Sequence, residues 1–132
     1  MPSNIEIVQA AYAAFGRGDV PGILALLAPD VRWEVVGDRA HFPTFGRWDG
    51  AEAVLRFFEA VGENEAFSIF DPNTFDLSGE NVFVSGHCES VIQRSGEAIA
   101  YDFLHIFTVR DGKIVAFREF FDSATIAQAY AA

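Results

Sequence analysis

Residues 103–122 read FLHIFTVRDGKIVAFREFFD, the pattern of two long β-strands around one tight turn. Alternate residues of a strand point to the same face of a sheet. One face of the first strand carries aromatic residues and a histidine: Tyr101, Phe103, His105, Phe107 and Val109. The opposite face, which includes Leu104 and Ile106, is also mostly apolar. In a short chain, this predicts a curved sheet with one face on an internal core and the other on a second subunit, so we expect a homodimer.

The turn allows two registers for the second strand. If residues 110–112 form a type I turn with a glycine bulge, Glu119 lies on the His105 face. If residues 111–112 alone form a type I′ loop, Arg118 lies on that face instead. A slip of one residue exchanges every side chain between the two faces. The register therefore decides which polar side chain faces the histidine.

Length and charge restrict the classes of protein. The chain has 132 residues, and we expect residues 1–132 to form one domain. Its 9 basic and 19 acidic residues give a net charge of −10, which repels phosphate backbones and anionic lipids, so we expect neither nucleic-acid nor membrane partners. The first residues lack the features of a signal peptide, which predicts a cytoplasmic protein. A single cysteine, Cys88, leaves no internal disulfide.

Helix signals gather in the first half of the chain. Residues 3–6 have the spacing of a capping box, and Asp19 is suited to cap a second helix. A further capping box at residues 49–52 predicts a third helix that ends near Gly62. The aromatic segment 37–48, between the helices, is typical of a lid or a pocket rim.

Strand signals dominate from residue 66 onward. The predicted strands are 67–77, 81–93, 98–110 and 113–122, followed by a short closing helix at 125–130. Pro72 indicates an edge strand or a bulge in the first of them. This order predicts an α+β fold: a cone-shaped α+β barrel in which three N-terminal helices pack on a curved, mostly antiparallel sheet around a pocket.

The order of elements resembles the superfamily of nuclear transport factor two, ketosteroid isomerase and the SnoaL-like polyketide cyclases over nearly the whole chain. The likeness is carried by GDVPGILALLAPDVRWE at residues 18–34, the helix at residues 50–58, HIFTVRDGKI at residues 105–114 and REFFD at residues 118–122. It implies the cone-shaped, SnoaL-like fold. It marks fold better than activity, because the superfamily contains enzymes and non-enzymes.

The isomerase branch works with an aspartate base and an oxyanion hole made of a tyrosine and a protonated aspartic acid. The resemblance places the tyrosine on Ala11 and the base on Val35. It places the protonated acid on His105. With two of its three groups missing, the isomerase mechanism is not implied for this chain, although one site keeps a polar group.

The cyclase branch implies a different pair. There an acidic residue on the last strand, near a histidine on the preceding strand, takes a proton from a carbon next to a carbonyl. Glu119 and His105 resemble that pair and are the candidate catalytic residues. We favour the register that places Glu119 beside His105, because it matches the pocket-facing pattern of the isomerase relative.

Aromatic side chains surround the candidate pair. A carboxylate enclosed by phenylalanine loses hydration, and a histidine beside it supplies a proton donor or a compensating charge. The alternative is a structural pair whose members satisfy each other. Tyr12 either packs in the core or turns its hydroxyl into the cavity. The candidate substrate-binding residues are Tyr12, Trp33, Val35, Phe57, Tyr101, Phe103, Phe117 and Phe121.

The sequence thus predicts an apolar pocket for a small hydrophobic molecule, of carbonyl or polyketide-like chemistry, in a cofactor-independent isomerase, cyclase or hydratase. The alternatives are a binding protein that leaves its ligand unchanged and a dimeric interaction module. His87 and Glu89 are two residues apart, but no third ligand has metal-site spacing, and no nucleotide-binding motif is present. We therefore predict neither a metal nor a cofactor.

Overall fold

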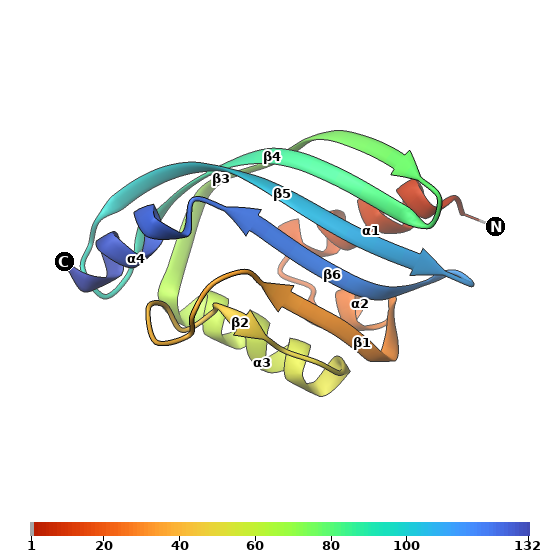
Figure 1. Ribbon diagram of the computed structural model, residues 1–132, viewed down its shortest axis with the longest axis horizontal. Helices are drawn as coiled ribbons and strands as arrows, with labels where there is room; N and C mark the ends of the chain where they lie inside the picture. The colour runs from red at the N-terminus through yellow and green to blue at the C-terminus, as the bar shows by residue number, and fades with distance from the viewer. Residues whose placement is uncertain (1) are drawn as a thin grey trace.

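The computed structural model describes residues 2–132 and has an α+β fold (Figure 1), as predicted. The helices of this part of the chain are α1 (Asn4–Gly16), α2 (Val20–Leu24), α3 (Ala51–Asn64) and α4 (Ser123–Ala131). The strands are β1 (Leu27–Val35), β2 (Gly46–Arg47), β3 (Glu65–Ser78), β4 (Asn81–Ile92), β5 (Ala98–Arg110) and β6 (Lys113–Phe121).

The six strands form one curved sheet in the order β2-β1-β6-β5-β4-β3. Neighbouring strands are antiparallel except β1 and β6, which are parallel. The sheet does not close, because its edge strands β2 and β3 are not paired with each other. It arches over α1, α2 and α3, and α4 lies at one end (Figure 1). These elements enclose the core on the concave side of the sheet.

Local capping explains two of the helix starts. Ser3 and Glu6 form the predicted capping box of α1, and the Asp19 side chain accepts a hydrogen bond from the backbone of Gly22 at the start of α2. The predicted capping box at residues 49–52 is wrong. Gly50 is the N-cap of α3, and the Asp49 carboxylate instead accepts a bond from the backbone of Trp33.

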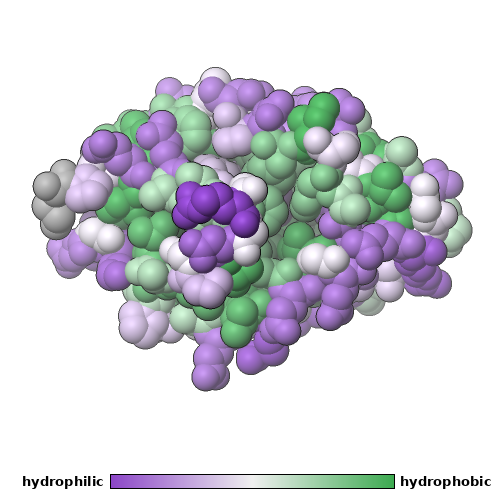
Figure 2. Space-filling model, turned by 180° about the vertical axis from the view of Figure 1, so that it is seen from behind, coloured by the Kyte–Doolittle hydropathy of each residue, from purple (hydrophilic) through white to green (hydrophobic). Residues whose placement is uncertain are grey.

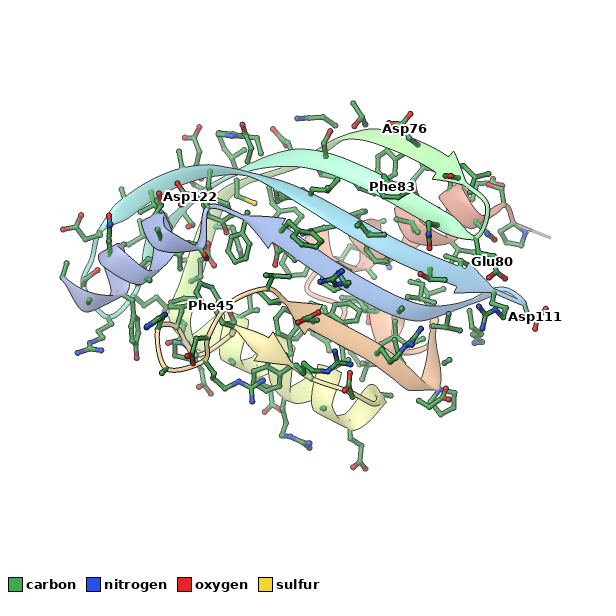
Figure 3. The ribbon with its side chains drawn as sticks, viewed as in Figure 1. Phe45, Asp76, Glu80, Phe83, Asp111 and Asp122 are labelled. Carbon is green, nitrogen blue, oxygen red and sulfur yellow. The ribbon has the colours of Figure 1, made fainter. Side chains whose placement is uncertain are left out.

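The hairpin turn between β5 and β6 is the two-residue loop. Asp111 and Gly112 have φ angles of 52° and 77°, as a type I′ turn requires, and Arg110 pairs with Lys113. Asp111 lies at the tip of this hairpin (Figure 3). The glycine-bulge turn that we favoured is therefore wrong.

A bulge farther along β6 restores the register expected of the other turn. Val109 pairs with Ile114, but the next pair joins Thr108 to Ala116, so Val115 is an extra residue in β6. Beyond the bulge, His105 pairs with Glu119. Glu119 faces His105, as we favoured, but the cause is the bulge in β6 and not the type of turn.

The segment before α3 is anchored to the core. Phe42 and Phe45 are buried, and Phe45 (labelled in Figure 3) packs edge-on against Phe121. The Arg39 guanidinium lies 4.0 Å above the ring of Trp48 and bonds to the carbonyl of Phe45. These contacts hold the segment as a fixed wall at the end of β1.

Pro72 lies in edge strand β3, where the register shifts between Pro72 and Thr74, so both features predicted for this proline are present.

The face of β5 that points away from the core carries Leu104, which is 37% exposed, and half-buried Ile106. Within residues 2–132, no helix combines the length and apolarity that a membrane crossing needs.

Candidate functional site

Three polar side chains from three elements form a continuous chain in the core. The hydroxyl of Tyr12 on α1 lies 2.6 Å from Nδ1 of His105 on β5. Nε2 of His105 lies 2.8 Å from Oε2 of Glu119 on β6. The His105 and Glu119 side chains are 5% and 15% exposed. This hydrogen-bonded chain thus runs from a helix across two strands in a largely buried region.

The hydrogen bonds between Tyr12, His105 and Glu119 determine where the protons lie when His105 is neutral. Burial, together with the charge of Glu119, raises the pKa of the Tyr12 hydroxyl, so this group keeps its proton and donates to Nδ1 of His105. The histidine proton then resides on Nε2 and is donated to Glu119. The ring of Phe103 stacks on the imidazole with 4.1 Å between centroids and holds its plane.

Glu119 keeps one oxygen available. Its hydrogen bond from His105 goes to Oε2, and no side chain or backbone group of residues 2–132 donates to Oε1. The residue lines a cavity in the core that is partly open. A carboxylate oriented through one oxygen and open through the other has the arrangement of a general base.

The cavity has a volume of about 80 Å³ and a mostly apolar wall. Its walls come from α1, α2, α3, the sheet and the segment before β2. The lining residues are Ala11, Tyr12, Phe15, Ile23, Trp33, Thr44, Phe57, Phe58, Val61, Glu65, Phe67, Phe70, Tyr101, His105, Phe107, Phe117, Glu119 and Phe121. From the side opposite Figure 1, a hollow near the middle of the surface is bordered in part by hydrophobic residues, with strongly hydrophilic residues beside it (Figure 2).

Eight of the residues proposed from sequence as catalytic or substrate-binding line this cavity: Tyr12, Trp33, Phe57, Tyr101, His105, Phe117, Glu119 and Phe121. Val35 and Phe103 do not. Val35 is 1% exposed and packs in the core beside its strand partner Glu119. Phe103 stacks on both His105 and Phe70, so it supports the imidazole instead of lining the space.

Sequence analysis missed Glu65, a second carboxyl group in the cavity wall. It is 7% exposed, and its Oε2 accepts hydrogen bonds from Tyr101 Oη at 2.6 Å and Ser90 Oγ at 2.7 Å. Burial raises the pKa of Glu65 and the charge of Glu119 adds to the rise, although both hydrogen bonds oppose it. One signal was present, because Glu65 lies two residues before Phe67 and so continues the inward side of that strand.

Trp33 contributes an unpaired donor. Among residues 2–132, its Nε1 is the one fully buried side-chain nitrogen or oxygen without a hydrogen-bond partner. The indole lines the cavity and stacks on Phe117 with 4.1 Å between ring centroids. Such a group costs stability unless something else accepts its hydrogen bond.

The histidine and acid noted at positions 87 and 89 lie on the outer face of the sheet. His87 bonds to Glu89 at 2.9 Å and to Asp102 at 2.8 Å. These hydrogen bonds raise the pKa of His87. No group of three or more metal-ligating side chains occurs within the described part of the chain.

The family is established by comparison with known proteins. The model of the SnoaL-like domain matches residues 8–117, and the chain therefore belongs to the SnoaL-like family. A comparison with curated proteins finds no match.

Solved structures share the fold over 96% or more of the chain. An NTF2-like protein of unknown function from Burkholderia pseudomallei is 30% identical, with a TM-score of 0.88 and full coverage of both chains. An NTF2-like protein from Burkholderia xenovorans is 31% identical, with a TM-score of 0.87, over 96% of this chain and 95% of that one. TerC, co-crystallized with polyporic acid, is 28% identical over 98% of both chains, with a TM-score of 0.83.

Proposed function

We propose that this protein binds a small hydrophobic carbonyl compound in its cavity and moves a proton on it without a cofactor. The observation that carries the proposal is the hydrogen-bonded chain of Tyr12, His105 and Glu119, which ends in a free carboxylate oxygen in an apolar cavity. The reaction class is proton abstraction from a carbon next to a carbonyl, leading to isomerisation, cyclisation or water addition.

In this proposal Glu119 is the base. Its Oε1 takes the proton from carbon while Oε2 remains bonded to His105. Both nitrogens of His105 are engaged within the protein, so it has no free N–H for a ligand. We therefore assign His105 the role of orienting Glu119 and sharing its proton, in place of direct donation to the ligand. Tyr12 holds the imidazole in the tautomer that this role needs.

The character of the cavity supports an aromatic or otherwise flat ligand. Its wall carries aromatic rings from α1, α3 and four strands. The unpaired indole N–H of Trp33 supplies a donor that an oxygen of a ligand would satisfy. TerC, which resembles this chain in sequence and fold, was crystallised with polyporic acid. These observations favour an oxygen-bearing hydrophobic molecule over a charged or nucleotide-like one.

A second candidate function is binding without reaction. It is favoured by the fact that both nitrogens of His105 and one oxygen of Glu119 are already bonded within the protein, as in a structural network. Under this alternative, ligand is recovered unchanged after long incubation.

Exchange of carbon-bound hydrogen with solvent distinguishes the two functions. We expect the wild type to accelerate deuterium uptake at the carbon next to the carbonyl of 2-tetralone, a small aromatic ketone, in ²H₂O. Glu119→Gln should lower that rate by about 10²- to 10⁴-fold, the usual contribution of a general base, with little change in ligand binding. Mass spectrometry measures the exchange, and saturation-transfer NMR measures the binding.

The matched control is Glu63→Gln, which removes one negative charge from an exposed site near the end of α3. It should exchange the ketone at the wild-type rate. Undiminished exchange by Glu119→Gln would eliminate Glu119 as the base. Binding of 2-tetralone without catalysed exchange would leave the binding function.

We also propose that the protein is a homodimer that uses the convex side of the sheet. Phe83 on β4, Leu104 and Ile106 on β5, and Phe120 on β6 lie on this side and are paired across the strands. We call these four residues the outer apolar face. A second copy of the chain, with the same apolar residues, would remove them from water.

A further inference from the structure

The second carboxyl group in the cavity wall, that of Glu65, accepts hydrogen bonds through only one of its two oxygens. Tyr101 and Ser90 both donate to the same oxygen, Oε2, at 2.6 and 2.7 Å. No group within residues 2–132 donates to Oε1, and Oε1 is not among the fully buried atoms without a partner. Because the residue is 7% exposed and lines the cavity, the space that Oε1 reaches is the cavity itself.

The surroundings disfavour a negative charge on this carboxyl group. No lysine or arginine is among the described residues that line the cavity, and the same wall already contains Glu119. Glu119 has a histidine partner, whereas the partners of Glu65 are two neutral hydroxyl groups. Two carboxylates in one apolar space repel each other, and the one without a histidine partner is the better site for a proton. Burial and Glu119 accordingly raise the pKa of Glu65.

A neutral carboxylic acid fits the hydrogen bonds. Its carbonyl oxygen accepts two bonds and its hydroxyl donates one. With Oε2 as the carbonyl oxygen, both donors are satisfied, and the hydroxyl at Oε1 has only the cavity in which to find an acceptor.

We propose that Glu65 is a neutral acid in the folded protein and donates a hydrogen bond from Oε1 to the carbonyl oxygen of the ligand. This inference rests on the proposed function and narrows it to ligands that place an acceptor oxygen at Glu65 and an acidic C–H at Glu119. As Glu119 takes the proton, the electron pair of the C–H bond moves toward the carbonyl oxygen, and the Glu65 hydroxyl stabilises the charge that develops there. The family resemblance does not mark this position.

Two substitutions of Glu65 test whether it acts as a neutral hydrogen-bond donor or as a negative charge. In Glu65→Gln the amide oxygen can accept from Tyr101 and Ser90, and the amide N–H replaces the hydroxyl donor. In Glu65→Leu both functions are lost. We expect Glu65→Gln to exchange the α-hydrogens of 2-tetralone within about threefold of the wild-type rate, and Glu65→Leu to lose about tenfold or more.

Infrared spectroscopy detects the carboxyl group of Glu65 and the carbonyl group of the ligand directly. In the protein without ligand at neutral pH, the wild type should show the carbonyl stretch of a protonated carboxyl group, and Glu65→Gln should lack it. The carbonyl stretch of bound 2-tetralone should move to lower frequency in the wild type and in Glu65→Gln, and return toward its unbound value in Glu65→Leu. The carboxylic acid band is observed in the wild-type protein, so its detection does not require any variant to fold.

Three results would overturn the inference. Absence of the carboxylic acid band means that Glu65 is ionised. A ketone stretch that is unchanged between wild type and Glu65→Leu means that Glu65 does not contact the ligand. Failure of 2-tetralone to bind removes the contact for aromatic ketones. If the infrared bands are as expected but the wild type does not catalyse exchange, the inference about Glu65 stands and the proposed proton transfer fails.

Discussion

At the scale of single residues, the unpaired indole of Trp33 shows how ligand binding and stability can be separated. Its N–H is buried without an acceptor, while its ring stacks on Phe117 and contacts Phe57. Trp33→Phe keeps an aromatic ring and removes the unsatisfied donor. We expect the free energy of unfolding to stay within about 1 kcal/mol of the wild type, because loss of the unsatisfied group offsets the lost volume.

The same substitution should weaken binding of 2-tetralone, the probe of the proposed function, by about tenfold, because the ligand loses one hydrogen bond in a largely buried site. Calorimetric titration measures the affinity, and denaturant unfolding measures the stability. Equal affinity in Trp33→Phe and wild type would show that the indole N–H does not contact this ligand.

At the scale of elements, a bulge in the hairpin of β5 and β6 sets which residue of β6 lies beside His105. Val115 is the extra residue between the pairs Val109–Ile114 and Thr108–Ala116. If Val115 is deleted, Ala116 directly follows Ile114 and the ladder becomes regular. We therefore expect the deletion variant to fold and to keep residues 105 and 119 paired, with some loss of stability because the twist that a bulge adds to the strand is lost.

Cross-strand nuclear Overhauser effects between residues 105 and 119 test this expectation, and thermal unfolding reports the loss of stability. The predicted pairing would be refuted by contacts between residues 105 and 118, which would show that the strand slips when the bulge is removed. In that case Val115 would set the register of β6 as well as its twist.

At the scale of the whole molecule, the outer apolar face predicts self-association. Leu104 is 37% exposed on the convex side, and Phe83, Ile106 and Phe120 lie beside it, half-buried. A charge in the centre of such a face opposes dimerisation strongly, because both copies present it at the same contact. We expect Leu104→Asp to raise the dimer dissociation constant by about 100-fold or more, corresponding to about 3 kcal/mol.

Sedimentation velocity over a range of concentrations measures this constant. Leu77→Asp is the matched control, because Leu77 is 55% exposed but pairs with Val82 and so belongs to the opposite face of the sheet. It should leave the dimer intact. A wild type that sediments as a monomer at every concentration would contradict the dimer.

The elements of this fold were largely predictable because their signals are local. A serine and a glutamate three residues apart cap α1, and strict alternation from Tyr101 to Val109 places all five inward residues of β5 in the core. The same alternation indicated that His105 faces inward. These patterns depend on backbone geometry over a few residues, and a single strand or helix carries them wherever it packs.

The site itself was decided by contacts between residues far apart in the chain. Tyr12 meets His105 across 93 positions, and Glu65 meets Tyr101 across 36. The bulge at Val115, which brings Glu119 to His105, follows no local turn signal. Sequence by itself determined the α+β class and the inward faces of the strands, because these follow from periodicity. Only the tertiary structure decided which polar groups share the cavity, because the register and the path of the sheet result from packing the whole core at once.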